Sequence, residues 1–229
     1  MKTIWSYNTL FFNSFLEVNM LESIRNIFCV GRNYALHAQE LNNAVPQVPL
    51  LFTKPTHSLA VANGREIIFP GDRGQIQYEV ELVFHIARRY EPGIKVDDLI
   101  DHVAIGIDFT LRDVQTELKK KGYPWLLAKG FINSAVITPW QPFAGLNALL
   151  NIDFTLDKNG KEVQRGNMKN MIFDLPTVVD YTAMHLGLDQ GDIIFTGTPE
   201  GVGPVLDGDQ FTCKLADQEL GNCIIKLSN

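Results

Sequence analysis

The stretch "IQYEVELVFHIA", residues 76–87, has the composition of a β-strand, yet it carries two glutamates separated by a single valine. Successive side chains of a strand point to opposite faces, so the even-numbered residues of this stretch form one apolar face. Glu79 and Glu81 share the other face, where alternate residues lie about 7 Å apart. That face is either exposed to solvent or part of a polar site, and Val83 beside the glutamates favours the second interpretation.

A third carboxylate, Asp108, interrupts the apolar run "VAIGIDF", residues 103–109, which predicts a strand buried on both faces. An unpaired charge in such a strand would be very costly, so Asp108 needs a partner. One candidate is a salt bridge to Arg112, and the other is a cation shared with Glu79 and Glu81. Three carboxylates without neighbouring cysteines favour a hard cation, Mg²⁺ or Mn²⁺, over zinc or copper.

A possible acid–base pair lies in "CVGRNYALHAQEL", residues 29–41. The pattern predicts a helix over 34–41, which would place His37 and Glu40 three residues apart on one face. A carboxylate in that position can orient an imidazole and raise its basicity, as a general base requires. An ordinary surface pair is the alternative.

Further polar candidates follow in the segment "FTLRDVQTELKKKGYPWLLAKGF", residues 109–131. A predicted helix over 111–121 places Arg112 and Gln115 three residues apart. Lys129 stands among apolar neighbours, where it either extends out of the core to solvent or directs its charge at an anionic substrate or oxyanion.

The glycine-rich segment "GDIIFTGTPEGVGPV", residues 191–205, predicts a strand that runs into a turn. It lacks the Gly-Lys-Ser/Thr of a phosphate loop, and Pro199 and Pro204 oppose the helix of a dinucleotide-binding motif. Its backbone N–H groups and the Thr198 hydroxyl could bind a carboxylate, or the turn is purely structural.

Composition limits the class of protein. The chain has 229 residues, 45% of them hydrophobic and 20% charged, which is typical of a globular protein with a substantial core. A formal net charge of −6 argues against nucleic-acid and anionic-membrane partners.

The 3 cysteines form no C-x-x-C pair, so a reducing, cytoplasmic location is predicted. Residues 1–22 are interrupted by polar side chains and predict a leader or a strand, not a signal peptide or membrane span, before a single domain over 23–229.

Many short strands and few helices are predicted along the chain. A third helix is expected over 175–186, and Asn159-Gly160 predicts a tight type I′ hairpin. The expected strands cover residues 27–31, 50–54, 66–70, 76–87, 103–109, 151–157, 161–166, 192–197, 210–215 and 223–227. This pattern predicts one β-rich domain with a few helices.

Taken together, these motifs resemble the fumarylacetoacetate hydrolase family, in particular its small acylpyruvase-like members. The resemblance covers "IFCVGRNYALHAQEL", "LLFTKP", "YEVELVFHIA", "AIGIDFTLRDVQ", "KGYPWLLAKGF", "MIFDLP" and "GDIIFTGTPEGVGPV" in order. It implies an α+β, mainly β fold, a mixed β-sheet roll of the family's C-terminal-domain type with a few short helices, and a homodimer. The roles it implies are metal binding by Glu79, Glu81 and Asp108, catalysis by His37, Glu40 and Lys129, and substrate binding by Arg112, Gln115 and Thr198.

The activity implied by this resemblance is metal-dependent hydrolysis of a carbon–carbon bond in 2,4-dioxo acids (acylpyruvates), giving pyruvate and a carboxylic acid. Mg²⁺ or Mn²⁺ would be the cofactor, and a small anionic oxo acid the substrate. Oxaloacetate decarboxylation, keto–enol tautomerisation and hydroxymuconate isomerisation at the same site are alternatives, because all pass through an enolate. Hydrolysis is favoured because the His37–Glu40 pair suits the activation of water. A non-catalytic, metal-stabilised domain that binds oxo acids is the alternative of a different class.

Overall fold

The computed structural model describes residues 21–40 and 44–228. The predicted N-terminal leader lies almost wholly outside the described residues, so its boundary with the domain stays a prediction. None of the helices within the described ranges is long and apolar enough to cross a membrane.

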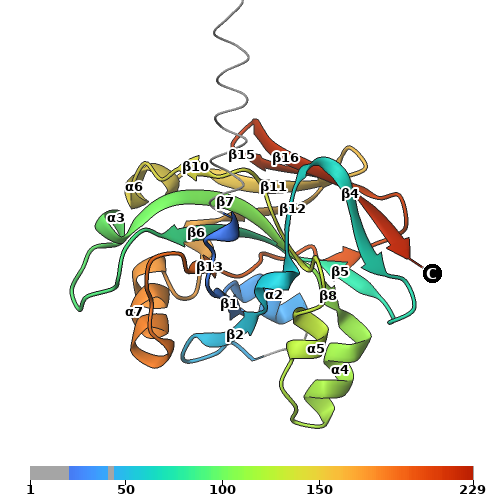
Figure 1. Ribbon diagram of the computed structural model, residues 1–229, viewed down its shortest axis with the longest axis horizontal. Coiled ribbons are helices and arrows are strands. Elements are labelled where there is room, and N and C mark those ends of the chain that lie inside the picture. The colour runs from blue at the N-terminus through green and yellow to red at the C-terminus, as the bar shows by residue number, and fades with distance from the viewer. Residues whose placement is uncertain (1–20, 41–43, 229) are drawn as a thin grey trace, which may run out of the picture.

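The largest sheet has eight strands and forms the centre of the molecule (Figure 1). Seven strands follow the order β2-β1-β13-β6-β7-β9-β3, and β10 pairs with β7. Their bounds are β1 (Ile27–Gly31), β2 (Leu50–Lys54), β3 (Leu59–Val61), β6 (Val80–Ile86), β7 (Ile100–Asp108), β9 (Ala135–Ile137), β10 (Gln141–Pro142) and β13 (Ile193–Phe195). Every residue of the central strand β6 is buried, so an exposed face for Glu81 is excluded.

Two smaller sheets complete the curled β-structure. The five-stranded sheet contains β4 (Asn63–Pro70), β11 (Asp153–Lys158), β12 (Lys161–Asn167), β15 (Gln210–Leu215) and β16 (Gln218–Ser228). The three-stranded sheet contains β5 (Ile76–Tyr78), β8 (Thr110–Leu111) and β14 (Gly203–Pro204). The predicted hairpin is confirmed between β11 and β12, where Asn159 and Gly160 have φ of 53° and 77°, as a type I′ turn requires.

The described helices are short and lie outside the sheets (Figure 1). They are α2 (Ala35–Glu40), α3 (Val96–Leu99), α4 (Arg112–Lys120), α5 (Leu126–Lys129), α6 (Leu146–Leu149) and α7 (Leu175–Leu186), with 3₁₀ turns η1 (Thr56–Ser58) and η2 (Met168–Asn170). The predicted helices correspond to α2, α4 and α7. Tyr34 precedes α2 in a β-bridge to Met171, and the predicted helix end at Leu41 lies outside the described residues. The mainly β fold class is confirmed.

The stretch at residues 76–87 differs from the prediction in one respect. It is divided between β5 and β6, with Glu79 between them. The division arises because β5 pairs with β8 and β14 in the small sheet, whereas β6 pairs with β7 and β13 in the large one. Glu79 therefore lies where the chain passes from one sheet to the other.

Candidate active site

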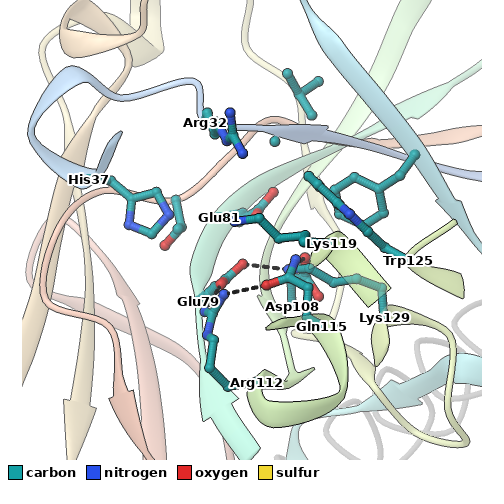
Figure 2. Close-up of a pocket in the computed structure, with 14 residues that line it drawn as sticks. Arg32, His37, Glu79, Glu81, Asp108, Arg112, Gln115, Lys119, Trp125 and Lys129 are labelled. Atoms are coloured by element: carbon teal, nitrogen blue, oxygen red, sulfur yellow. Dashed lines mark hydrogen bonds and ion pairs between the residues drawn. The ribbon is translucent and has the colours of Figure 1, made fainter. Parts of the chain in front are cut away.

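One pocket, with about 430 Å³ of space that is partly open to solvent, is lined by residues far apart in the sequence, from Val30 to Thr198 (Figure 2). It is formed where β1 and β7 end and β6 begins, beside α4 and α5. Eight of the nine predicted site residues line it: His37, Glu79, Glu81, Asp108, Arg112, Gln115, Lys129 and Thr198. The ninth, Glu40, contacts His37 from outside the pocket lining. The structure therefore brings the predicted residues together, while their roles stay predictions.

Three carboxylates form the centre of the pocket. Glu79 precedes β6, Glu81 lies on it, and Asp108 ends the neighbouring strand β7, which pairs with β6 from Val80↔Ile107 onward. Each carboxylate offers one oxygen within 4.8 Å of the others. The three residues are only 5%, 2% and 0% exposed. The pairing of β6 with β7, which the sequence alone did not predict, thus brings the Glu79–Glu81 motif and Asp108 into one cluster.

Three cations surround these carboxylates. Lys129 Nζ lies 2.7 Å from both Glu79 Oε2 and Asp108 Oδ2. Arg112 donates to Glu79 Oε1, and Lys54 Nζ lies 2.7 Å from Asp108 Oδ1. The first candidate partner of Asp108, Arg112, is therefore wrong, because the guanidinium at the start of α4 contacts Glu79 while Lys54 and Lys129 pair with Asp108. Lys129 is 3% exposed, so extension of this lysine to solvent is also excluded.

Lys54 is a site residue that sequence reasoning missed. It ends β2, is 3% exposed, and donates hydrogen bonds to the Phe109 carbonyl at 3.3 Å and the Ser134 carbonyl at 3.0 Å. It also donates to the Lys129 carbonyl. A lysine at the end of a strand is usually exposed, so its burial depends on contacts distant in sequence. The available signal was its position inside "LLFTKP", one of the motifs that resembled the family.

The pKa values of Glu79 and Glu81 are shifted in opposite directions. Burial acts to raise the pKa of Glu79, but Lys129 and Arg112 outweigh it and hold that pKa well below its ordinary value. Burial acts to lower the pKa of Lys129, but Asp108 and Glu79 raise it, so the ammonium group stays protonated. Burial and then Asp108 raise the pKa of Glu81 well above its ordinary value, against a hydrogen bond from Gly197.

Glu81 gives the test of whether the residues fit a metal ion. Its carboxylate accepts the Gly197 N–H at 2.7 Å, and it has no salt bridge within the part of the chain that the structure describes. A buried carboxylate without a cation is costly. A divalent cation shared with Glu79 and Asp108 would remove this cost, and three carboxylate oxygens suit Mg²⁺ or Mn²⁺. The donor set therefore fits the predicted metal.

The predicted acid–base pair forms on α2. His37 is 4% exposed, and its Nδ1 lies 3.4 Å from Glu40 Oε2. Glu40 also accepts the Gly201 N–H at 3.1 Å, which fixes its carboxylate against the loop after β13. Burial lowers the pKa of His37 from 6.5, although Glu79 and Glu40 oppose this effect. The ring is therefore neutral at pH 7 and is not part of a surface pair.

The glycine-rich loop is held against β6 by Gln164, another residue that the sequence did not single out. Gln164 Nε2 donates to Thr198 Oγ1 at 2.9 Å, and its Oε1 accepts the Val80 N–H at 2.9 Å. Gln115 accepts a hydrogen bond from Arg112 at 2.7 Å. Thr198 and Gln115, two of the three predicted substrate-binding residues, are thus positioned by hydrogen bonds to neighbouring side chains.

Comparison with known proteins gives a match over nearly the whole chain. The family model described as Fumarylacetoacetate (FAA) hydrolase C-terminal matches residues 26–227. The chain is 39% identical over 190 residues to oxaloacetate tautomerase FAHD1, mitochondrial, of Bos taurus, covering 82% of this chain and 85% of that protein. It is 37% identical over 195 residues to oxaloacetate decarboxylase, mitochondrial, of Dictyostelium discoideum, with coverage of 84% and 89%.

A solved structure of a fumarylpyruvate hydrolase is also similar to this chain over most of its length. The crystal structure of fumarylpyruvate hydrolase from Pseudomonas aeruginosa, in complex with Mn²⁺ and pyruvate, matches with a TM-score of 0.83 and 30% identity. The match covers 90% of this chain and 91% of that one. The names of the two sequence relatives place those proteins in mitochondria, whereas the cytoplasmic location of this chain stays a prediction. Its homodimeric state and its lack of nucleic-acid and membrane partners also stay predictions.

Proposed function

The chain belongs to the fumarylacetoacetate hydrolase family, and we propose that it is a metal-dependent oxaloacetate tautomerase that interconverts the keto and enol forms. This choice takes up an alternative to the acylpyruvate hydrolase predicted from the sequence. The oxaloacetate tautomerase and oxaloacetate decarboxylase named among the relatives support it over carbon–carbon hydrolysis.

The observation that carries the proposal is the charge of the buried cluster. Glu79, Glu81 and Asp108 are balanced by three cations, namely Lys54, Arg112 and Lys129. With a divalent cation bound, the cluster has a formal excess of two positive charges, provided that all three carboxylates are ionised. That excess complements oxaloacetate, which is a dianion at neutral pH, and a low-dielectric pocket strengthens the attraction.

The cation, when bound, polarises the 2-oxo group and lowers the cost of forming the enolate. Removal of the proton from C3 then requires a neutral base beside the pocket. His37 meets this requirement, because burial lowers its pKa and Glu40 is placed to accept a proton carried on Nδ1. The lone pair on Nε2 is then free to accept the C3 proton and to return it in the reverse direction.

The cationic side chains supply fixed positive charge around the reacting atoms. Lys129 is held protonated by Asp108 and Glu79, so it donates to a developing oxyanion and is not a base. Trp125 lies on the side of the pocket opposite His37 (Figure 2). The ring of Phe52, which also lines the pocket, has its centroid 5.9 Å from that of Trp125. Their rings limit the water around the enolate.

Hydrolysis of a 2,4-dioxo acid is the second candidate, and the His37–Glu40 pair favours it. A neutral, buried imidazole oriented by a carboxylate can deprotonate water as well as carbon. The similarity to the fumarylpyruvate hydrolase supports the same candidate. The two reactions differ in product, because tautomerisation leaves all four carbons of oxaloacetate together.

The test compares substrates on one enzyme preparation with Mg²⁺ or Mn²⁺. Enol-oxaloacetate decay is followed by its ultraviolet absorbance, and pyruvate release is measured from oxaloacetate and from acetylpyruvate. We expect enol decay without stoichiometric pyruvate, and a loss of about 10²-fold or more in the His37→Asn variant. Pyruvate release from acetylpyruvate that exceeds enol decay would replace the proposal by hydrolysis, and pyruvate from oxaloacetate would replace it by decarboxylation. Cation binding without any turnover would favour the non-catalytic domain.

The pH dependence gives an independent check on the base. The proton-accepting form of His37 is the neutral one, and its pKa lies below 6.5. We therefore expect the rate to be at its plateau at pH 7 and to fall only as the pH drops below 6.5. A plateau that begins above pH 7 would contradict a neutral His37, and a profile unchanged by Glu40→Gln would contradict its coupling to Glu40.

A further inference from the structure

Gln164 is a buried polar residue that the proposed chemistry does not use. It lies on β12, outside the largest sheet, and is 2% exposed. Its Nε2 donates to Thr198 Oγ1 at 2.9 Å and to the Pro199 carbonyl at 3.0 Å. Its Oε1 accepts the Val80 N–H at 2.9 Å. The side chain therefore joins the glycine-rich loop after β13 to the start of β6.

The partners of the Gln164 amide fix its orientation. A backbone N–H can only donate, so Val80 must face the amide oxygen. A carbonyl can only accept, so Pro199 must face the amide nitrogen. Rotation of the amide by half a turn would place two donors together at Val80 and two acceptors together at Pro199. The third partner, Thr198, consequently meets an N–H group, and its hydroxyl oxygen accepts.

This arrangement determines what the Thr198 hydroxyl can do. A hydroxyl has one hydrogen to donate and two lone pairs that accept. Gln164 occupies a lone pair, and the hydroxyl donates its hydrogen to no residue in the ranges 21–40 and 44–228. Thr198 is 3% exposed and lines the pocket, so a bound ligand is the partner left for that hydrogen.

The loop around Thr198 is packed closely against its neighbours. The Gly197 N–H donates to Glu81 at 2.7 Å. Gly201 has a φ of 97°, and a methyl group on its α-carbon would approach the Val163 carbonyl oxygen to 2.4 Å. The loop is therefore held at two points, and the Gln164 amide holds the part between them.

We propose that Gln164 is a positioning residue, whose amide makes the Thr198 hydroxyl a hydrogen-bond donor to an anionic oxygen of the molecule bound in the pocket. This inference rests on the proposed function for the presence of an oxo-acid anion there. It adds a residue of the five-stranded sheet that acts on the ligand through Thr198. Because the hydroxyl can then only donate, this position favours an ionised carboxylate over a group that presents a donor.

The test measures binding apart from turnover, with oxalate as an unreactive anion. Calorimetric titration gives the affinity of each protein for Mn²⁺, and then the affinity of the Mn²⁺-loaded protein for oxalate. The variants are Gln164→Met, Thr198→Val and the two combined. Thr182→Val is the matched control, because Thr182 is buried, donates to the Val178 carbonyl within α7 and does not line the pocket.

The oxalate affinities should not be additive. Thr198→Val should lose about tenfold, as for a hydrogen bond to a charged group. Gln164→Met should lose about fivefold when Thr198 is present, and less than about twofold in the Thr198→Val background, where the hydroxyl that it orients is absent. Thr182→Val should bind oxalate as wild type does. Affinity for Mn²⁺ should change less than about twofold throughout, since all three carboxylates remain.

Three results would overturn the inference. One is an equal loss from Gln164→Met with and without the Thr198 hydroxyl, and another is an unchanged oxalate affinity in Gln164→Met. The third is a loss of Mn²⁺ affinity as large as the loss of oxalate affinity, which would mean that Gln164 only supports the carboxylates.

If Gln164→Met does not fold, Gln164→Glu takes its place in the same comparison. The introduced carboxylate keeps an acceptor for the Val80 N–H, but in its ionised form it cannot donate to Thr198. Its direct repulsion of oxalate is present in both Thr198 backgrounds and cancels when the two losses are compared. A larger loss with the Thr198 hydroxyl present than without it is again the expected result, and equal losses would overturn the inference.

The outcomes separate this inference from the proposed function. If the effect of Gln164 on oxalate affinity depends on Thr198 while wild type leaves enol-oxaloacetate unchanged, the positioning role stands and the tautomerase proposal fails. If wild type converts enol-oxaloacetate and the losses from Gln164 and Thr198 are additive, the tautomerase proposal stands and the positioning role fails.

Discussion

The same pair of strands, β6 and β7, carries two clusters of potential metal ligands, and the clusters differ in how their charges are satisfied. Glu81, paired in register with Gly106, belongs to the pocket cluster. Four residues further along, His85 pairs with His102, and both contact Asp101. Both clusters bring together residues that could bind a metal ion, so the proximity of such residues does not by itself identify a metal site.

In the second cluster, which consists of His85, Asp101 and His102, the carboxylate already has partners within the cluster. The single carboxylate of Asp101 lies 2.6 Å from His85 Nδ1 and 3.1 Å from His102 Nδ1. Burial acts to raise the pKa of Asp101, but the hydrogen bonds from the two imidazoles lower it below its ordinary value. In the pocket cluster, by contrast, Glu81 is buried without a cation and has a raised pKa. A requirement for additional positive charge therefore distinguishes the candidate metal site.

The largest difference should appear when each cluster loses its shared aspartate. Asp108→Asn leaves the buried ammonium groups of Lys54 and Lys129 without one of their anions, and we expect a loss of about 3–5 kcal/mol in the free energy of unfolding. The matched Asp101→Asn removes a side chain that is 40% exposed, so solvent screening should limit its cost to about 0–1 kcal/mol. Urea denaturation measures both, and equal losses would show that the clusters do not differ in this way.

An intermediate effect is expected for Glu81→Gln. Because the pKa of Glu81 is raised in the folded protein, its ionisation destabilises the cation-free fold as the pH rises above 4.5. Glu81→Gln should therefore be more stable than wild type at pH 7 without a metal ion. Wild type should gain about 2.7 kcal/mol from Mn²⁺ at 100 times its dissociation constant, and the variant much less. Thermal unfolding with and without Mn²⁺ tests both, and a variant less stable than wild type without Mn²⁺ would contradict the raised pKa.

The smallest effect is expected for His102→Gln. Its side chain is 31% exposed and shares Asp101 with His85, so the free energy of unfolding should change by less than about 1 kcal/mol. The stabilisation by Mn²⁺ should equal that of wild type. A reduced response to Mn²⁺ in His102→Gln would place a cation at the second cluster and remove the distinction drawn between them.

Local sequence patterns predicted most of the longer strands, the helices α2, α4 and α7 and the Asn159-Gly160 hairpin, because alternation and turn chemistry are properties of neighbouring residues. They missed short elements, among them β3 and β9 of the largest sheet and the helices α3, α5 and α6. They did not predict that the stretch at 76–87 divides at Glu79, since the cause is a change of sheet. The residue types of the pocket were anticipated, but the partner of Asp108 was not. Its pairing with Lys54 joins β2 to β7, and only the register and order of the strands determine that contact.

The contacts that complete the pocket also determine when it can form during synthesis. Lys54 donates to the carbonyl of a residue 75 positions later, Glu81 accepts an N–H from 116 positions later, and Glu40 accepts one from 161 positions later. The last of these donors, Gly201, is therefore synthesised well after Glu40, Lys54 and the three carboxylates. A nascent chain thus carries the three carboxylates long before it has the loop that holds Glu81 and Glu40 in place. If the cluster binds a metal ion, we expect its full affinity to develop only once the loop that contains Gly197 and Gly201 has been made.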